Sequence, residues 1–169
     1  EEAVAELKDG DGFTAEEKWS PQISIGTAVL IPESYVPDLQ LRLGLYRRLS
    51  DIRDAEEIDA FAAELIDRFG PMPEEVDYLL KIVFIKGLCF IANVEKVDAG
   101  PKGVVISFRN NDFPAAAQLV GYLGEQGAMA KIRPDQSIFL QRNWDSADKR
   151  LKGAGVILSK LAGFVKELQ

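Results

Sequence analysis

The sequence predicts an α+β fold in which helices pack with a small, mainly antiparallel sheet. The first half of the chain carries apolar residues at helical spacing, whereas the second half changes to short apolar runs with the two-residue period of strands. Turn residues separate these runs at 100–103 and at 134–135. A chain of 169 residues, 47% of them hydrophobic, can build one domain with a sizeable core.

The first 22 residues are expected to lie outside this domain. Residues 1–8 have the pattern of the last turns of a helix, and residues 9–22 are polar and contain glycine, as linkers do. The chain also begins without methionine, which indicates a fragment. We therefore predict that 1–22 are the tail of a preceding domain with its linker, and that 23–169 form the domain proper.

Two elements follow the linker. Residues 23–31 start with alternation and become continuously apolar, which predicts an extended segment across the domain surface that ends at Pro32. A short helix over 37–49 is apolar over more than half of its circumference, so it should touch more than one neighbour. Arg47 and Arg48 occupy its polar side, and we expect them to form a basic strip near the acidic helix that follows.

The helix over 54–70 has the best-defined ends. Asp54 can cap its start with Glu57 as a capping-box partner, and Gly70 followed by Pro71 supplies its exit. Apolar residues at helical spacing predict a buried stripe, formed by Ile58, Phe61, Ala62, Leu65 and Phe69. The opposite side is charged and carries Glu57, Glu64, Asp67 and Arg68.

The next helix, over 73–92, is apolar on nearly every side and is the predicted central core helix. It contains the single cysteine, Cys89, which cannot form an internal disulfide and should be a small buried hydrophobe. Asp112 is expected to cap a helix over 114–123, and heptad-like spacing over 144–168 predicts a helix that docks on this domain or on a partner. The predicted strands are 94–97, 104–108, 128–132 and 138–140.

Composition argues against catalysis and against a membrane. The chain has no histidine, which removes the usual proton shuttle and the commonest metal ligand. Carboxylate pairs such as Glu74 and Glu75 lie at predicted helix starts, where the helix dipole already accounts for them. We predict a domain that is not an enzyme and that holds no cofactor or metal. No apolar run is long enough to cross a bilayer and no signal peptide is visible, so a cytoplasmic location is expected.

The candidate site is the charged side of the second helix, with Glu64, Asp67 and Arg68. Glu64 and Arg68 are four positions apart with the acid first, which is the favourable order for an exposed pair within one helix, worth about 0.2–0.5 kcal/mol. That is the simplest interpretation of the pattern alone. Acidic and basic groups on a rigid helix can also pair with another protein surface while rejecting wrong registers.

A family resemblance bears on this choice. The residues that carry it are Val36, Pro37, Asp38, 42–49, 64–70 and Pro73. In type, order and spacing they resemble the C-terminal domain of the bacterial transcription-repair coupling factor (Mfd) family. The resemblance covers roughly residue 23 to the end of the chain, and its specific motifs lie before Leu80.

The resemblance implies a regulatory domain of a longer protein. In that family the parent protein is an ATP-dependent DNA translocase, and this domain packs against the UvrB-like N-terminal module of the same chain. That contact hides the surface that recruits the repair protein UvrA. On this reading the contacts come from Glu64, Asp67 and Arg68, with Arg47 and Arg48 as weaker candidates, and release follows when the motor engages stalled RNA polymerase. The parent motor, not this domain, would make the main DNA contacts.

Two alternatives come from other classes of function. A DNA- or RNA-polymerase-contacting module is suggested by a group of basic residues: Lys131, Arg133, Arg142, Lys149, Arg150 and Lys152. The net charge of −7 argues against a large phosphate-binding surface, although local basic patches remain compatible with it. A small-ligand regulatory domain is suggested only by the sheet-and-helix outline of the second half, and fold analogy of that kind carries little weight.

Overall fold

The computed structural model describes residues 19–169. Its strands are β1 (Gln22–Ser24), β2 (Val94–Gly100), β3 (Gly103–Phe108), β4 (Ala130–Ile132) and β5 (Ile138–Gln141). Its helices are α2 (Leu39–Ser50), α3 (Ala55–Phe69), α4 (Glu74–Ala92), α5 (Ala116–Gln126) and α6 (Ala147–Lys166). Short 3-10 turns occupy Arg109–Asn111 and Gly127–Met129. The expected α+β class is confirmed, and the helix tail predicted over 1–8 lies outside the described residues.

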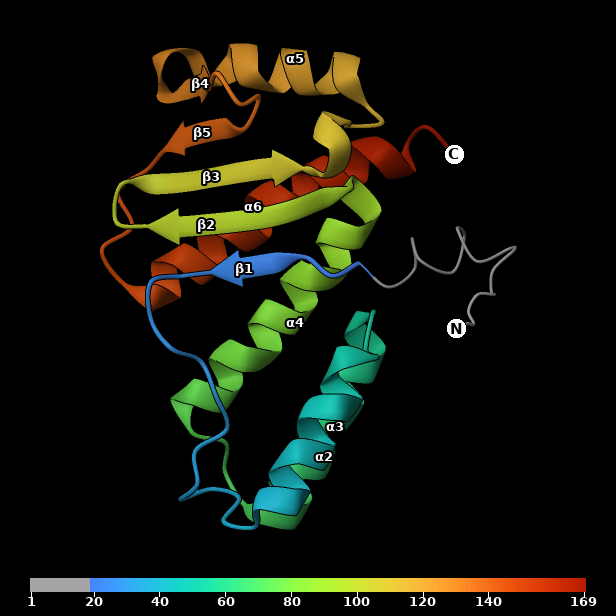
Figure 1. Cartoon of the computed structure of the whole chain (residues 1–169), viewed down its shortest axis with the longest axis vertical. Coiled ribbons are helices and arrows are strands. Elements are labelled where there is room, and N and C mark those ends of the chain that lie inside the picture. The colour runs from blue at the N-terminus through green and yellow to red at the C-terminus, as the bar shows by residue number, and fades with distance from the viewer. Residues whose placement is uncertain (1–18) are drawn as a thin grey trace, which may run out of the picture.

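The strands form one sheet in the order β1-β2-β3-β5-β4. Only the β1–β2 pair is parallel within this sheet, and the other three pairs are antiparallel, as the sequence predicted. Figure 1 shows α4 and α6 on one side of the sheet, and α5 beside the edge that β4 forms. The sheet therefore has one face covered by helices.

The extended segment at the start of the domain differs from the expectation. It does not simply lie across the surface, because Ile23 pairs in parallel register with Val97 and so extends the sheet by one strand. The pairing satisfies backbone donors and acceptors that β2 would otherwise expose at the sheet edge. Ile25, just after the strand, is buried and anchors the segment.

The helix α4 belongs to two hydrophobic cores. Its C-terminal half packs with the sheet and α6 around residues such as Ile85 and Cys89, which we call the sheet core. Its N-terminal half packs with α2 and α3 around residues such as Leu65 and Leu80, which we call the helical core. At the junction lies Gly87, where a Cβ atom would stand 2.5 Å from the backbone oxygen of Arg53. This sharing explains why α4 is apolar on nearly every side.

The last helix docks on its own domain. The heptad-like residues of α6 are buried against α4 and the sheet, and Ser146 caps the helix start by accepting a hydrogen bond from the Lys149 N–H at 3.2 Å. Trp144 packs on Gly153, where any larger side chain would collide with the indole ring. The sequence left open whether this helix docks on its own domain or on a partner, and in the structure it docks on its own domain.

The predicted cap of α5 is wrong. The helix begins at Ala116, and no side chain caps it. Asp112 has another role, because its backbone oxygen accepts a hydrogen bond from Asn93 Nδ2 at 2.6 Å. Asn93 ends α4 in the left-handed conformation, and its amide also donates to the Arg109 oxygen at 3.0 Å. The Asn93 side-chain amide therefore holds the turn before α5, where a helix cap by Asp112 was expected.

Candidate protein-interaction site

Both ends of α3 are held by defined hydrogen bonds. Asp54 Oδ1 accepts from the Glu57 N–H at 2.9 Å, as predicted, whereas the Glu57 carboxylate accepts from the Arg53 N–H and not from Asp54. At the other end Gly70 has a φ of 91°, and the Tyr35 hydroxyl donates to the backbone oxygen of Gly70 at 2.7 Å. The helix is therefore a rigid support for the side chains on its outer face.

The two faces of α3 differ as the sequence predicted. Ile58, Phe61 and Leu65 are buried in the helical core. The Glu64 side chain projects to the other side and keeps 35% of its accessible surface. This arrangement follows from helical periodicity, since residues three and four apart share one face.

Glu64 is the centre of a cluster that joins two helices. Arg48 of α2 donates from both terminal nitrogens to the two carboxylate oxygens of Glu64, each at 2.7 Å. Arg68 donates to Glu64 Oε2 from one turn along α3, at 3.0 Å. Bidentate arginine–carboxylate pairs combine charge with fixed geometry. We call Arg48, Glu64 and Arg68 the charge cluster.

Electrostatics and stacking stabilise the charge cluster. The hydrogen bonds from Arg48, and then those from Arg68, lower the pKa of the Glu64 carboxyl to about 2, so the group stays ionised at neutral pH. The Arg48 guanidinium lies 4.9 Å from the Phe61 ring centre, and that of Arg68 lies 5.0 Å from the Phe69 ring centre. Each arginine therefore has an aromatic ring of the helical core beside it. Both remain more than two-fifths exposed.

The other two predicted site residues are not in the cluster. Asp67 and Arg47 are exposed, and neither forms an ion pair with another residue in the range 19–169. Arg47 lies in the last turn of α2, where the helix dipole favours a cation. The structure thus brings three of the five predicted residues together and leaves two free beside them.

Sequence reasoning missed two features of this surface. A shallow cavity of about 340 Å³ lies beside the charge cluster, and Asp51, Ile52 and Ala60 line it together with Arg48 and Glu64. The only sequence signal was the small residue Ala60 on the charged side of α3. The second feature is α2 itself, whose leucines are incompletely covered within the described part of the chain: Leu39, Leu41 and Leu43 are 55%, 41% and 40% exposed.

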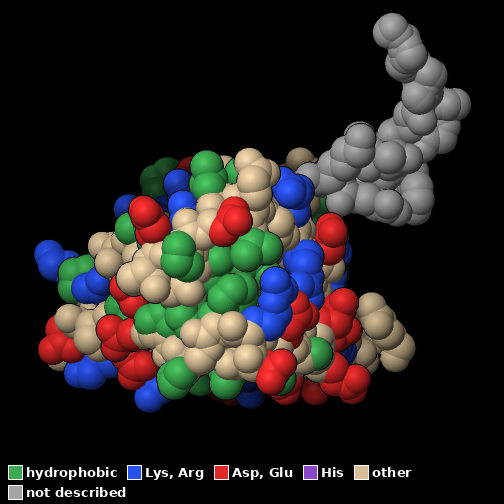
Figure 2. Space-filling view, turned by 90° about the horizontal axis from the view of Figure 1, so that it is seen from below, with side chains coloured by type: hydrophobic (Ala, Val, Ile, Leu, Met, Phe, Trp, Pro, Cys, Tyr) green, Lys and Arg blue, Asp and Glu red, His purple; other side chains and the backbone are tan. Residues whose placement is uncertain are grey.

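Apolar side chains are visible at the end of the molecule that carries α2 and α3. Figure 2 views the structure from this end and shows an apolar patch across the middle of the face, with basic and acidic side chains around it. Apolar surface ringed by charge is typical of protein interfaces.

The alternative basic group does not form one free patch. Arg150 donates hydrogen bonds to the backbone oxygens of Trp144 and Ile25, each at 3.0 Å. Lys149 and Lys152 pair with aspartates four positions earlier, at 3.0 and 3.1 Å. Cations with such partners are poorly arranged to neutralise a row of phosphates.

Other kinds of site find little support in the part of the chain that the structure describes. There, no three side chains of the metal-binding types gather, and no helix is long and apolar enough to span a membrane. Cys89 is buried, and burial raises the pKa of its thiol to about 12, which suits a packing residue and not a nucleophile.

Comparisons with known proteins show which family the chain resembles. The model of the TRCF domain family matches residues 25–119. The transcription-repair-coupling factor of Rickettsia bellii is 42% identical over 138 residues, which are 82% of this chain and 12% of that protein. The Escherichia coli transcription-repair-coupling factor is 31% identical over 75% of this chain and 11% of its own length. The chain thus spans about an eighth of these relatives.

A solved structure shows the same fold. The crystal structure of a C-terminal domain of transcription-repair coupling factor superposes with a TM-score of 0.73, covering 89% of this chain and 97% of the other, at 19% sequence identity. The family model includes α2, α3 and α4 and therefore the whole charge cluster. The chain belongs to the TRCF domain family, and the relatives that it matches are transcription-repair-coupling factors.

Proposed function

We propose that this domain is an autoinhibitory protein-interaction domain. It would pack against the UvrB-like N-terminal module of its parent chain and cover the surface that recruits UvrA. The observation that carries the proposal is the charge cluster: a solvent-exposed carboxylate held by two arginines from two helices, on a surface that the family model includes. The domain itself would catalyse nothing, and the proposed site is one of contact.

The geometry suggests how each residue contributes. Glu64 already accepts hydrogen bonds from Arg48 and Arg68, so its main contribution is to hold the two guanidinium groups in place. Each guanidinium keeps further N–H donors that can bind carboxylates or backbone oxygens of a partner. Asp67 offers an acceptor next to them. Alternating charges of this kind favour one docking register and penalise others.

Exposed apolar surface complements the charges. Leu41 lies two turns before Arg48 on α2, on the same side of the helix, and is 41% exposed. A contact that covers both residues would bury apolar area beside an arginine, and arginine is enriched at the centres of protein interfaces. This accounts for the broad apolar face of α2.

Tethering makes modest contacts sufficient. When two modules belong to one chain, their effective concentration reaches about the millimolar range for short flexible linkers. A weak contact can therefore keep the UvrA-binding surface covered until another event separates the modules. We propose that this event is engagement of stalled RNA polymerase by the ATP-driven translocase of the parent protein, which also makes the main DNA contacts.

The direct test is binding between this chain and the separately expressed UvrB-like module. Replacing Glu64, Asp67 and Arg68 with alanine should weaken binding at least about tenfold, because truncating paired interface charges costs about 2–5 kcal/mol. A matched control replaces Glu95, Lys96 and Asp98, three exposed residues of β2 with the same combination of charges. Equal affinities of the two triple variants would reject the proposed site, and failure of the unaltered chain to bind would reject the proposed contact.

A further inference from the structure

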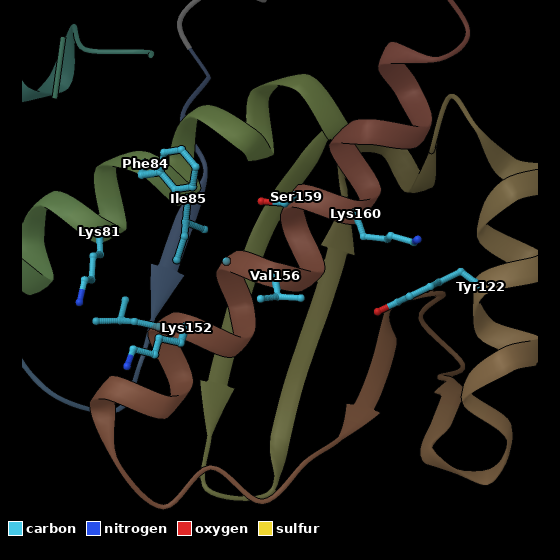
Figure 3. A pocket seen from close by; sticks show the side chains of 10 residues that line it. Lys81, Phe84, Ile85, Tyr122, Lys152, Val156, Ser159 and Lys160 are labelled. Carbon is cyan, nitrogen blue, oxygen red and sulfur yellow. The ribbon is translucent and has the colours of Figure 1, made fainter. Parts of the chain in front are cut away.

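A second surface lies between α4 and α6. It is an open groove of about 630 Å³, and side chains from α4, α5 and α6 line it. Ile85 and Leu151 are buried at its base. Figure 3 shows Phe84 and Lys81 of α4 on one side of Val156, and Tyr122 of α5 on the other. We call this surface the α4–α6 groove.

The groove leaves apolar side chains in water. Val156 is 71% exposed and Phe84 is 39% exposed, and both line the same depression. Scattered exposed apolar residues are ordinary, whereas adjacent ones in a concave surface indicate a contact site. The α4–α6 groove therefore has the shape and chemistry of a site that another apolar surface covers.

Gly155 leaves open space in the groove. Glycine is unfavourable inside a helix, and a close approach of another group explains some helical glycines. Gly87 and Gly153 are of this kind, because Arg53 and Trp144 occupy the space that their side chains would need. A Cβ atom on Gly155 would instead have no neighbour within 4 Å. The space above Gly155 is free within the described domain and can admit a group from outside.

Charge around the groove indicates the kind of partner. Three lysines line it, Lys81, Lys152 and Lys160, and no acidic residue does. Lys81 and Lys152 lie near two exposed aspartates, Asp77 and Asp148, at 3.1–3.9 Å. Counting these five groups leaves one positive charge in excess, on a chain whose net charge is −7. Lys160 is the lining lysine that forms no ion pair within residues 19–169, so it is the cation most available to a carboxylate from outside.

We infer that the α4–α6 groove binds an amphipathic helix with an apolar face and acidic flanks. The occupant is a helix and not a strand, because the groove runs between two helices and offers no free strand edge for main-chain pairing. Apolar side chains at helical spacing would lie against Val156 and Phe84, close to the backbone at Gly155. Glutamates or aspartates beside them would pair first with Lys160, and would share Lys81 and Lys152 with the aspartates that already contact these two lysines.

The groove is separate from the proposed inhibitory site. Its residues belong to α4, α5 and α6, whereas the charge cluster lies on α2 and α3. The two surfaces can therefore be tested independently. Alanine at Glu64, Asp67 and Arg68 should leave binding in the groove unchanged.

The test uses a labelled synthetic helical peptide with leucines at positions i, i+4 and i+7 and glutamates beside them. Fluorescence anisotropy should show that it binds the chain, and that a peptide with lysine in place of each glutamate binds at least about tenfold more weakly. Val156→Glu should weaken binding of the acidic peptide by a similar factor. Val120→Glu is the matched control, because Val120 is 69% exposed on α5 and does not line the groove.

Several outcomes would overturn the inference. One is the absence of acidic-peptide binding, and another is equal binding by the Val156→Glu and Val120→Glu variants. Preference for the lysine peptide would reject the proposed chemistry. Concentration-dependent dimerisation that Val156→Glu abolishes would identify a second copy as the occupant. If Val156→Glu does not fold, the charge change Lys152→Glu with Lys160→Glu tests the same surface, since both side chains are exposed.

Discussion

The two cores of this domain support different kinds of surface. Around the sheet core, charged side chains pair mainly over four positions of the chain, as Lys152 does with Asp148 in α6 and Lys149 with Asp145 just before this helix. At the helical core, the Arg48–Glu64 pair joins two helices through two hydrogen bonds of 2.7 Å. Pairs within a helix mainly support that helix. A bidentate pair between helices fixes a shape, which is what a specific contact surface needs.

The shared helix α4 links the two regions. Residues of α4 are buried in both cores, so neither core is complete without it. This predicts one cooperative unfolding transition, not separate melting of the helical layer and the sheet.

The largest expected effects come from matched cavities in the two cores. Leu65 and Leu161 are each 1% exposed, Leu65 in the helical core and Leu161 in the sheet core. Replacing either with alanine should lower the free energy of unfolding by about 2–5 kcal/mol, through lost transfer energy and the cavity left behind. Chemical denaturation followed by circular dichroism measures this, with Leu168→Ala, at 53% exposure, as the control. Two transitions, of which Leu65→Ala shifts only one, would show that the cores unfold independently.

A smaller effect is expected where the two cores meet. Gly87→Ala places a methyl group against the Arg53 backbone, and such overpacking costs about 1–3 kcal/mol. Gly155→Ala is the control, because Gly155 also lies inside a helix but has free space where the methyl group would go. It should raise the free energy of unfolding by up to about 1 kcal/mol. Denaturation midpoints of the two variants should therefore move in opposite directions. Equal stabilisation by both would contradict the close approach at Gly87.

The smallest effect on stability is expected from the charge cluster. Glu64→Gln removes an exposed ionic contact and should cost no more than about 1 kcal/mol at neutral pH. The pKa of Glu64 is lowered to about 2 in the folded chain, against about 4.3 in an unfolded one. Its stabilising contribution is thus complete above about pH 4.3 and is lost as the pH falls toward 2.

The pH dependence provides the check on this last prediction. The difference in unfolding free energy between the unaltered chain and Glu64→Gln should shrink as the pH is lowered from about 4.3 toward 2. Glu95→Gln, at an exposed position of β2, serves as the comparison. A constant difference across this range would mean that the carboxylate is not held by Arg48 and Arg68 in solution.

Local signals predicted the helical layer well. Asp54 and Gly70 mark the two ends of α3, as the sequence predicted, and Asp38 caps the start of α2. Capping and periodicity depend on near neighbours, so they can be read from one sequence. The failures concern distant partners: Ile23 pairs with Val97, and Asn93 bridges to Asp112, where a helix cap was expected. No local pattern encodes these contacts.

The candidate site likewise combines local features that the sequence predicted with contacts between helices that it did not. The four-residue spacing predicted the Arg68–Glu64 pair, and the basic strip on α2 was expected near the acidic helix. The bidentate bond from Arg48 depends on how α2 and α3 pack, and the sequence ranked Arg48 only as a weaker candidate beside Arg47. The exposure of Leu41 and the cavity beside Ala60 also depend on packing. These features appear only once the helices are placed together.

The most direct test of the proposed inhibition is the affinity of the full-length parent protein for UvrA. With Glu64, Asp67 and Arg68 all replaced by alanine, the domain should remain folded, since these side chains are outside the cores. UvrA should then bind the full-length variant more tightly than the unaltered protein, while the Glu95, Lys96 and Asp98 control variant binds as before. Unchanged UvrA affinity in a correctly folded triple variant would contradict the assignment of the charge cluster as the inhibitory contact.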